Sequence, residues 1–75
     1  MEKVLPVFGE RLKALRKEKR LKQKEMAELI ERTDRNYQKM EYGETNVPAL
    51  TLIKLADFFD VSVDYLLGRD DRRKP

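Results

Sequence analysis

Apolar residues recur at helical spacing along most of the chain, and no stretch alternates in the manner of a β-strand. Near the N-terminus, Phe8, Leu12 and Leu15 share one face between charged positions. Residues 23–30 place most of their apolar side chains on one stripe. Further on, Tyr37 and Met40 are three positions apart and share a buried face. The pattern therefore predicts an all-α fold.

Capping and turn residues divide this pattern into five helices. Thr33 and Ser62 are typical N-caps, Gly43 and Gly68 are typical stops, and Pro48 suits the first turn of a helix. We expect helices from residue 8 onward and over residues 23–30, 34–42, 48–60 and 62–68. The fourth is expected to bury a wide apolar face, made of Leu52, Ile53, Leu55, Ala56 and Phe59.

The composition limits the chain to one small, soluble domain. With 75 residues and no cysteine, the fold depends on a single core of packed side chains. We assign the domain to residues 1–68 and a flexible charged tail to residues 69–75, which contain no apolar side chain except that of Pro75. No apolar run approaches a membrane span and residues 1–10 do not resemble a signal peptide, so we expect a cytoplasmic protein.

The candidate chemistry is that of binding. Histidine and cysteine are absent, as are a glycine-rich phosphate loop and an obvious pair of catalytic carboxylates, so we expect no metal, no cofactor and no enzymatic activity. Charge is uneven, because residues 1–24 carry nine basic and three acidic side chains and residues 25–68 carry four basic and nine acidic ones. A local positive surface suits a polyanion, although a solvated helix face would give the same pattern.

The second and third expected helices have the outline of a helix-turn-helix. Gln23 opens the first of them, Ala27 lies where the two would touch, and Glu41 and Gly43 end the second. In the stretches LKALRKEKRLKQKEMAELI, NYQKMEYG and LIKLADFFDVSVDYLLG, the chain resembles the XRE/Cro-like family of phage-repressor type. The resemblance covers about residues 8–68 and implies a lambda-repressor-like bundle of five helices that binds DNA.

By this resemblance, the helix over residues 34–42 lies in the major groove and its outward side chains read bases. Arg35 can grip guanine O6 and N7, and Asn36 or Gln38 can pair with adenine. Asp34 can accept a hydrogen bond from cytosine N4 or help to cap the helix. A merely solvent-facing role is the alternative for Gln38 and Lys39, and a core role is the alternative to base stacking for Tyr37. The expected base-contacting set is Asp34, Arg35, Asn36, Gln38 and Lys39.

The resemblance also implies contacts that carry no sequence information. Gln23 and the amides that follow it would meet a phosphate, and neighbouring lysines would add positive charge. The expected backbone-contacting set is Lys22, Gln23, Lys24, Thr33, Thr45 and Asn46. Arg16 and Glu41 match the family's partly buried ion pair between the first and third helices.

The turn departs from the family pattern, which has glycine and then an apolar residue where this chain has Glu31 and Arg32. A non-glycine residue in the left-handed region costs about 1 kcal/mol. Both residues also favour helix, so residues 23–42 could instead form one continuous helix and a domain-swapped dimer.

We expect a sequence-specific transcription regulator, most simply a repressor, that binds a palindromic operator in double-stranded DNA as a homodimer. The expected dimer interface consists of Phe58, Tyr65 and Leu67. The rival interpretation is a protein-interaction module of the same fold, similar to an antitoxin or antirepressor.

Overall fold

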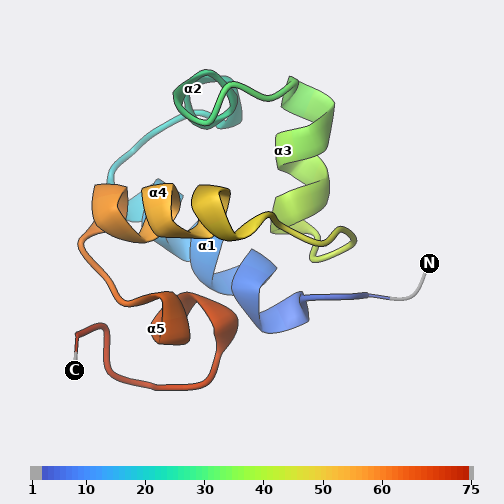
Figure 1. Cartoon of the computed structure of the whole chain (residues 1–75). Coiled ribbons are helices and arrows are strands. Elements are labelled where there is room, and N and C mark those ends of the chain that lie inside the picture. Colours follow the sequence, from blue (N-terminus) through green and yellow to red (C-terminus); the bar gives the residue numbers. More distant parts are fainter. Residues whose placement is uncertain (1–2, 75) are drawn as a thin grey trace.

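The computed structural model describes residues 3–74, and this part of the chain contains five helices and no strand (Figure 1). Helix α1 spans Pro6–Glu18, α2 spans Gln23–Leu29, α3 spans Asp34–Glu41, α4 spans Ala49–Phe59 and α5 spans Val63–Leu67. The all-α fold of five helices predicted from the sequence is confirmed. Its Cα radius of gyration is 11.2 Å. None of the helices within residues 3–74 is long and apolar enough to cross a membrane.

Side-chain caps set the start of two helices, α3 and α5. The Thr33 hydroxyl accepts a hydrogen bond from the Asn36 amide at 3.1 Å, and the Ser62 hydroxyl accepts one from the Tyr65 amide at 2.9 Å. These bonds satisfy amides that the first turn of a helix leaves without partners. Helix α1 begins at Pro6, two residues before the expected start, because a proline suits the first helical position.

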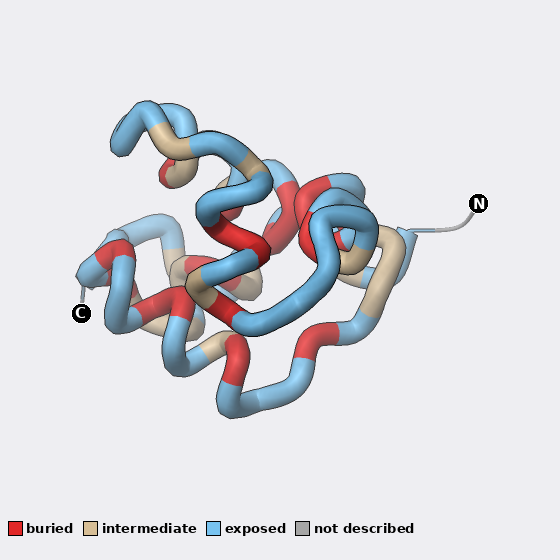
Figure 2. The backbone as a smooth tube through the Cα atoms, turned by 90° about the horizontal axis from the view of Figure 1, so that it is seen from above, coloured by how far each residue is buried: buried red, intermediate tan, exposed pale blue. Residues whose placement is uncertain are grey.

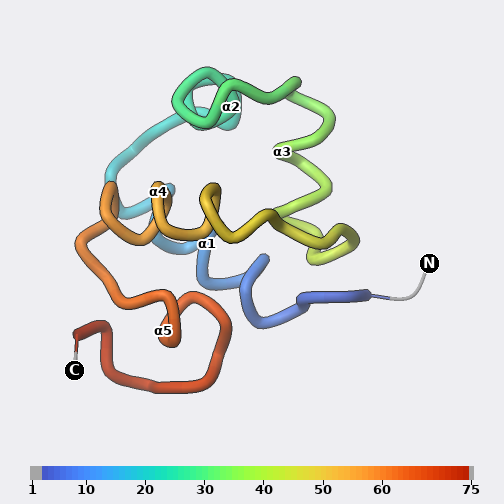
Figure 3. Tube along the Cα trace, in the orientation of Figure 1, coloured from blue at the N-terminus to red at the C-terminus, as the bar shows by residue number. Residues whose placement is uncertain are grey.

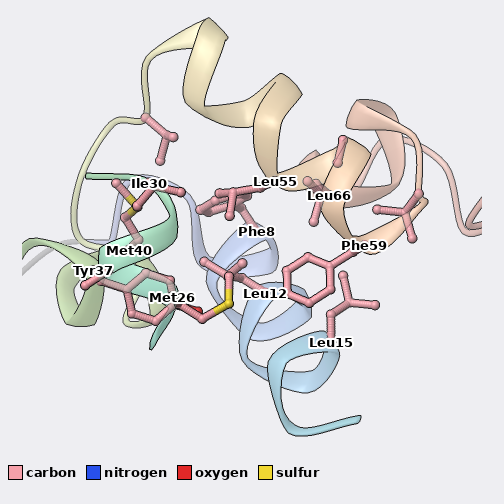
Figure 4. Packing of buried hydrophobic residues seen from close by; sticks show 14 residues of the cluster. Phe8, Leu12, Leu15, Met26, Ile30, Tyr37, Met40, Leu55, Phe59 and Leu66 are labelled. Atoms are coloured by element: carbon pink, nitrogen blue, oxygen red, sulfur yellow. The ribbon is translucent and has the colours of Figure 1, made fainter. Parts of the chain in front are cut away.

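The core takes side chains from all five helices (Figure 4). Helix α1 packs against α3 and α5, α2 packs against α3, and α4 packs against α5. Figure 2 shows the buried positions as short stretches along the chain, separated by exposed ones. Ile53 was wrongly predicted to be buried, since 49% of it is exposed on the outer side of α4. The buried apolar residues are Phe8, Leu12, Leu15, Met26, Ala27, Ile30, Tyr37, Met40, Val47, Leu55, Ala56, Phe59, Val61 and Leu66.

Helices α2 and α3 are separate, so the alternative of one continuous helix is wrong for this structure. Glu31 adopts a left-handed conformation with φ of 56°. The Arg32 amide then donates to the Ala27 carbonyl oxygen at 2.9 Å, which ends α2, and the Arg32 side chain lies in solvent. Glu31 thus takes the backbone conformation that glycine adopts most easily, and Arg32 leaves no buried charge.

The charged tail after α5 runs back along the domain (Figure 3). The Arg73 carbonyl oxygen accepts a hydrogen bond from the Ser62 amide at 2.7 Å. The Arg73 guanidinium donates two hydrogen bonds to the Glu18 carboxylate, and Arg11 donates to the Asp70 carbonyl oxygen. The structure thus gives residues 69–74 defined contacts with α1 and the start of α5, while the domain boundary at residue 68 and the mobility of the tail stay predictions.

Candidate nucleic-acid interface

The outer face of α3 is polar along its whole length. Asp34, Arg35, Gln38 and Lys39 are exposed, and Asn36 is half-buried. The inner face is apolar, with Tyr37 fully buried and Met40 1% exposed. Tyr37 lies among the core side chains in Figure 4, so it takes the core role and not the base-stacking one. The structure brings the five expected base-contacting residues together on one short helix.

A buried ion pair holds the C-terminal end of α3 against α1. Arg16 Nε lies 2.5 Å from Glu41 Oε2, and Arg16 Nη2 lies 3.2 Å from Glu41 Oε1. The side chains are 12% and 2% exposed, respectively. Arg16 Nη1 also donates to the Leu21 carbonyl oxygen at 2.8 Å, so the same guanidinium fixes the turn between α1 and α2. This geometry orients α3 relative to the rest of the bundle.

The electrostatics of this pair favour its charged form. Burial of the Glu41 carboxyl is the largest single effect and opposes ionisation, but the hydrogen-bond donors around it, Arg16 first and Gln23 among them, together with the Arg16 charge outweigh it, so the pKa of Glu41 is lowered. The hydrogen bonds between Arg16 and Glu41 also raise the pKa of Arg16. Burial raises the pKa of the neighbouring Tyr37 hydroxyl, which stays neutral. The pair is therefore a fixed charge contact at neutral pH.

The residues expected to contact the DNA backbone lie before and after α3 in the sequence. Lys22 and Lys24 are exposed at the start of α2, and Gln23 between them is half-buried. Gln23 does not simply face outward, because its Nε2 donates to Glu41 Oε1 at 3.1 Å. Thr33 uses its hydroxyl to cap α3. In the loop after α3, Thr45 is half-buried and donates to the Asn46 carbonyl oxygen, and Asn46 is exposed.

The residues expected to form a dimer interface lie away from α3, on α4 and α5. Phe58 is 38% exposed and packs edge-on against Phe59. Tyr65 and Leu67 are half-buried. The Tyr65 ring already has contacts within the chain, since the guanidinium carbon of Arg11 lies 4.2 Å from its centroid and that of Arg73 lies 5.8 Å away.

Sequence reasoning missed two features of this arrangement. One is the bond from Gln23 to Glu41, which joins a residue expected to contact the DNA backbone to a residue of the expected ion pair. The other is Arg11, which donates to the Tyr65 carbonyl oxygen in α5 as well as to the tail. Neither contact follows from local spacing, since the paired residues are 18 and 54 positions apart. The sequence offers one signal for these contacts, the position of Gln23 at the start of a helix.

Comparisons with known proteins agree with this architecture. A family model described as helix-turn-helix matches residues 12–66. The chain belongs to this helix-turn-helix family, which confirms the resemblance to XRE/Cro-like proteins.

Three similar relatives come from Bacillus subtilis (strain 168). YqaE, an uncharacterized HTH-type transcriptional regulator, is 38% identical over 91% of this chain and 59% of its own length. YonR, an SPbeta prophage-derived uncharacterized HTH-type transcriptional regulator, is 41% identical over 81% of this chain and 56% of its own length. ImmR, an HTH-type transcriptional regulator, is 38% identical over 89% of this chain and 53% of its own length. The chain thus spans little more than half of these relatives, and no solved structure matches it significantly.

Proposed function

We propose that the chain is a sequence-specific DNA-binding domain that regulates transcription, and that α3 reads the major groove of double-stranded DNA. The observation that carries the proposal is the polar outer face of α3, set on a helix whose inner face and C-terminal end are held by the core and by the Arg16–Glu41 pair. A rigid helix with exposed hydrogen-bonding side chains can keep a fixed register in a groove. The names of its relatives as transcriptional regulators support the same function.

In this proposal, Arg35 is the principal base-reading residue, because its guanidinium can donate two hydrogen bonds to one guanine. Asp34, Asn36, Gln38 and Lys39 complete the reading face. Side chains on both flanks of α3 contact phosphates and set the register without reading sequence. These flanking residues are Lys22, Gln23, Lys24, Thr33, Thr45 and Asn46.

We further propose that two copies bind a palindromic operator and repress transcription. A single reading helix buries too little surface for tight and selective binding, and twofold symmetry doubles it. Half-sites would be about 10 base pairs apart, so that both reading helices meet the same side of the duplex. Phe58, Tyr65 and Leu67 are the proposed contact between the copies.

Selection of binding sites from a pool of random duplexes tests the proposal. We expect enrichment of a palindrome, with affinity that falls steeply as the salt concentration rises because bound phosphates release counterions. A matched duplex with scrambled half-sites serves as the control. Recovery of no preferred sequence, together with weak and salt-insensitive binding, would overturn DNA recognition and favour the protein-interaction module.

A further inference from the structure

The charged tail after α5 is attached to the domain through polar contacts at its far end. The Arg73 guanidinium donates to both carboxylate oxygens of Glu18, at 2.9 and 2.5 Å, and the Arg73 carbonyl oxygen accepts from the Ser62 amide at 2.7 Å. Lys74 Nζ lies 2.6 Å from Asp60 Oδ2. Figure 1 shows the tail passing around α5 and returning to the connection between α4 and α5. The tail is thereby tied to the end of α1 and to that connection.

The attached tail also lies against part of the proposed contact between two copies. That contact consists of Phe58, Tyr65 and Leu67, and Tyr65 is half-buried within the single chain. The guanidinium carbon of Arg73 lies 5.8 Å from the centroid of the Tyr65 ring, and that of Arg11 lies 4.2 Å from it. Arg11 belongs to α1 and stays with the domain, whereas Arg73 can leave with the tail. A second copy that packs on Tyr65 therefore competes with Arg73 for the ring.

The contacts at the end of the tail are of a kind that can be broken. The Glu18 and Arg73 side chains are 51% and 50% exposed, and those of Asp60 and Lys74 are 79% and 61% exposed. Ion pairs this exposed to water are individually weak. Residues 69–74 contain no apolar side chain whose burial could add to them. Burial of apolar side chains between two copies can therefore outweigh the attachment of the tail.

We propose that the tail is an autoinhibitory strap, which holds Arg73 beside Tyr65 in the single copy and is released when a second copy packs there on the operator. This inference rests on the proposed function, in particular on the proposed contact between the copies. Because a chain offers its whole contact surface only when its tail is released, the strap lowers the apparent affinity between copies in proportion to the fraction of released chains. A tail that is attached for about nine-tenths of the time lowers this affinity about tenfold.

The first test measures cooperativity, defined as the affinity of the second copy for a palindrome divided by the affinity of one copy for a single half-site. Both affinities include the same contacts with DNA, so a change of charge in the tail largely cancels in the ratio. Arg73→Ala and Glu18→Gln break the same ion pair and change the net charge in opposite directions. We expect each of them to raise the ratio by about three- to tenfold. Arg72→Ala is the matched control and should keep the ratio, since the described side-chain hydrogen bonds of Arg72 go to Asp70 within the tail.

A second measurement uses the parent protein and does not depend on whether a variant folds. Nuclear magnetic resonance should show the Ser62 amide protected from solvent exchange in the free protein and on a single half-site, because it donates to the Arg73 carbonyl oxygen. With two copies on a palindrome, the same amide should exchange faster.

The outcomes separate the strap from the function on which it rests. Equal protection of the Ser62 amide in all three states, or an unchanged ratio in either Arg73→Ala or Glu18→Gln, would overturn the strap alone. So would an equal rise of the ratio in Arg72→Ala. A parent protein that binds a palindrome as one copy, or binds no duplex selectively, would overturn the proposed function and this inference with it.

Discussion

Gly9 in α1 packs directly against the backbone around Glu41 in α3. A Cβ atom at Gly9 would lie 2.8 Å from the Gly43 amide nitrogen and closer still to the Glu41 carbonyl oxygen. Both are backbone atoms, which cannot move aside as the end of a flexible side chain can. The two helices therefore touch through their backbones at the end of α3 where the Arg16–Glu41 pair forms.

This contact predicts that Gly9→Ala destabilises the fold. Alanine stabilises a helix relative to glycine by about 0.5 to 1 kcal/mol. Overpacking a tight contact costs about 1 to 3 kcal/mol, so we expect the destabilising effect to be the larger one. Urea denaturation should therefore show a net loss of about 1 to 2 kcal/mol. Lys13→Ala, at an exposed position of the same helix, is the control and should stay within about 0.5 kcal/mol of the parent. Equal stability of Gly9→Ala and parent would show that α1 and α3 are farther apart.

The Arg16–Glu41 pair should contribute strongly to stability. Arg16→Ala or Glu41→Ala leaves the other charge largely buried without its partner, and we expect each to cost about 3 kcal/mol. Arg69→Ala is the control, because Arg69 and Asp64 are 77% and 67% exposed and 4.0 Å apart. Thermal or urea unfolding measures both effects. If the variants at Arg16 and Glu41 unfold at the same temperature or urea concentration as the parent, the pair is not buried.

The same pair gives stability a dependence on acid pH. Because the pKa of Glu41 is lower in the folded state than in the unfolded chain, its contribution is complete above the unfolded value and is lost as pH falls through the folded one. The loss should begin near pH 4.3, the ordinary value for glutamate. Glu18 also has a lowered pKa, because Arg73 donates hydrogen bonds to its carboxylate. The pH dependence of stability in Glu18→Gln is therefore compared with that in Glu41→Gln. A parent and a Glu41→Gln variant with the same pH slope would exclude this contribution.

Glu31→Gly should stabilise the protein. Glu31 has a φ of 56°, a left-handed conformation that costs about 1 kcal/mol in a residue other than glycine. The added entropy of glycine in the unfolded chain offsets about 0.5 kcal/mol of this, so we expect a net gain of about 0.5 kcal/mol. Glu31→Ala removes the same carboxylate without that relief and should show no such gain. If both variants have the same stability in urea, the turn carries no backbone strain that glycine relieves.

Arg35→Ala should weaken binding to the selected operator by about 1 to 3 kcal/mol and relax the preference at one base pair. The reason is the loss of a bidentate contact with guanine. Repeating the site selection with the variant measures both effects. Since Arg35 is exposed, the fold should be unchanged, which circular dichroism can check. An identical selected sequence would remove Arg35 from the reading set.

The last prediction concerns assembly on DNA. Sedimentation should show two copies of the parent on one palindrome, and Phe58→Asp should weaken binding of the second copy by placing a charge in the proposed interface. Leu50→Asp is the matched control on the same helix, where Leu50 is 81% exposed and lies outside the proposed interface. One parent copy per palindrome, or equal effects of the two substitutions, would contradict the proposed dimer surface.

Most of the fold could be predicted because the responsible signals are local. Thr33 and Ser62 cap helices whose amides lie three positions further on, and the spacing of apolar residues defines each buried face. The polar outer face of α3 follows from the same periodicity, since Tyr37 and Met40 turn inward. The helix-turn-helix order and the candidate reading residues were therefore available from the sequence by itself.

The tertiary structure decided the points where two local preferences compete or where distant residues meet. Glu31 favours helix, yet core packing on both sides of the turn holds it in the left-handed region. Ile53 fits the apolar pattern of α4, but it lies on a side of the helix that leaves 49% of it exposed. Gln23 turns toward Glu41 because α1 brings Arg16 and the end of α3 to the start of α2. Contacts of this kind depend on how the helices pack, and the one-dimensional pattern carries no information on the distance between them.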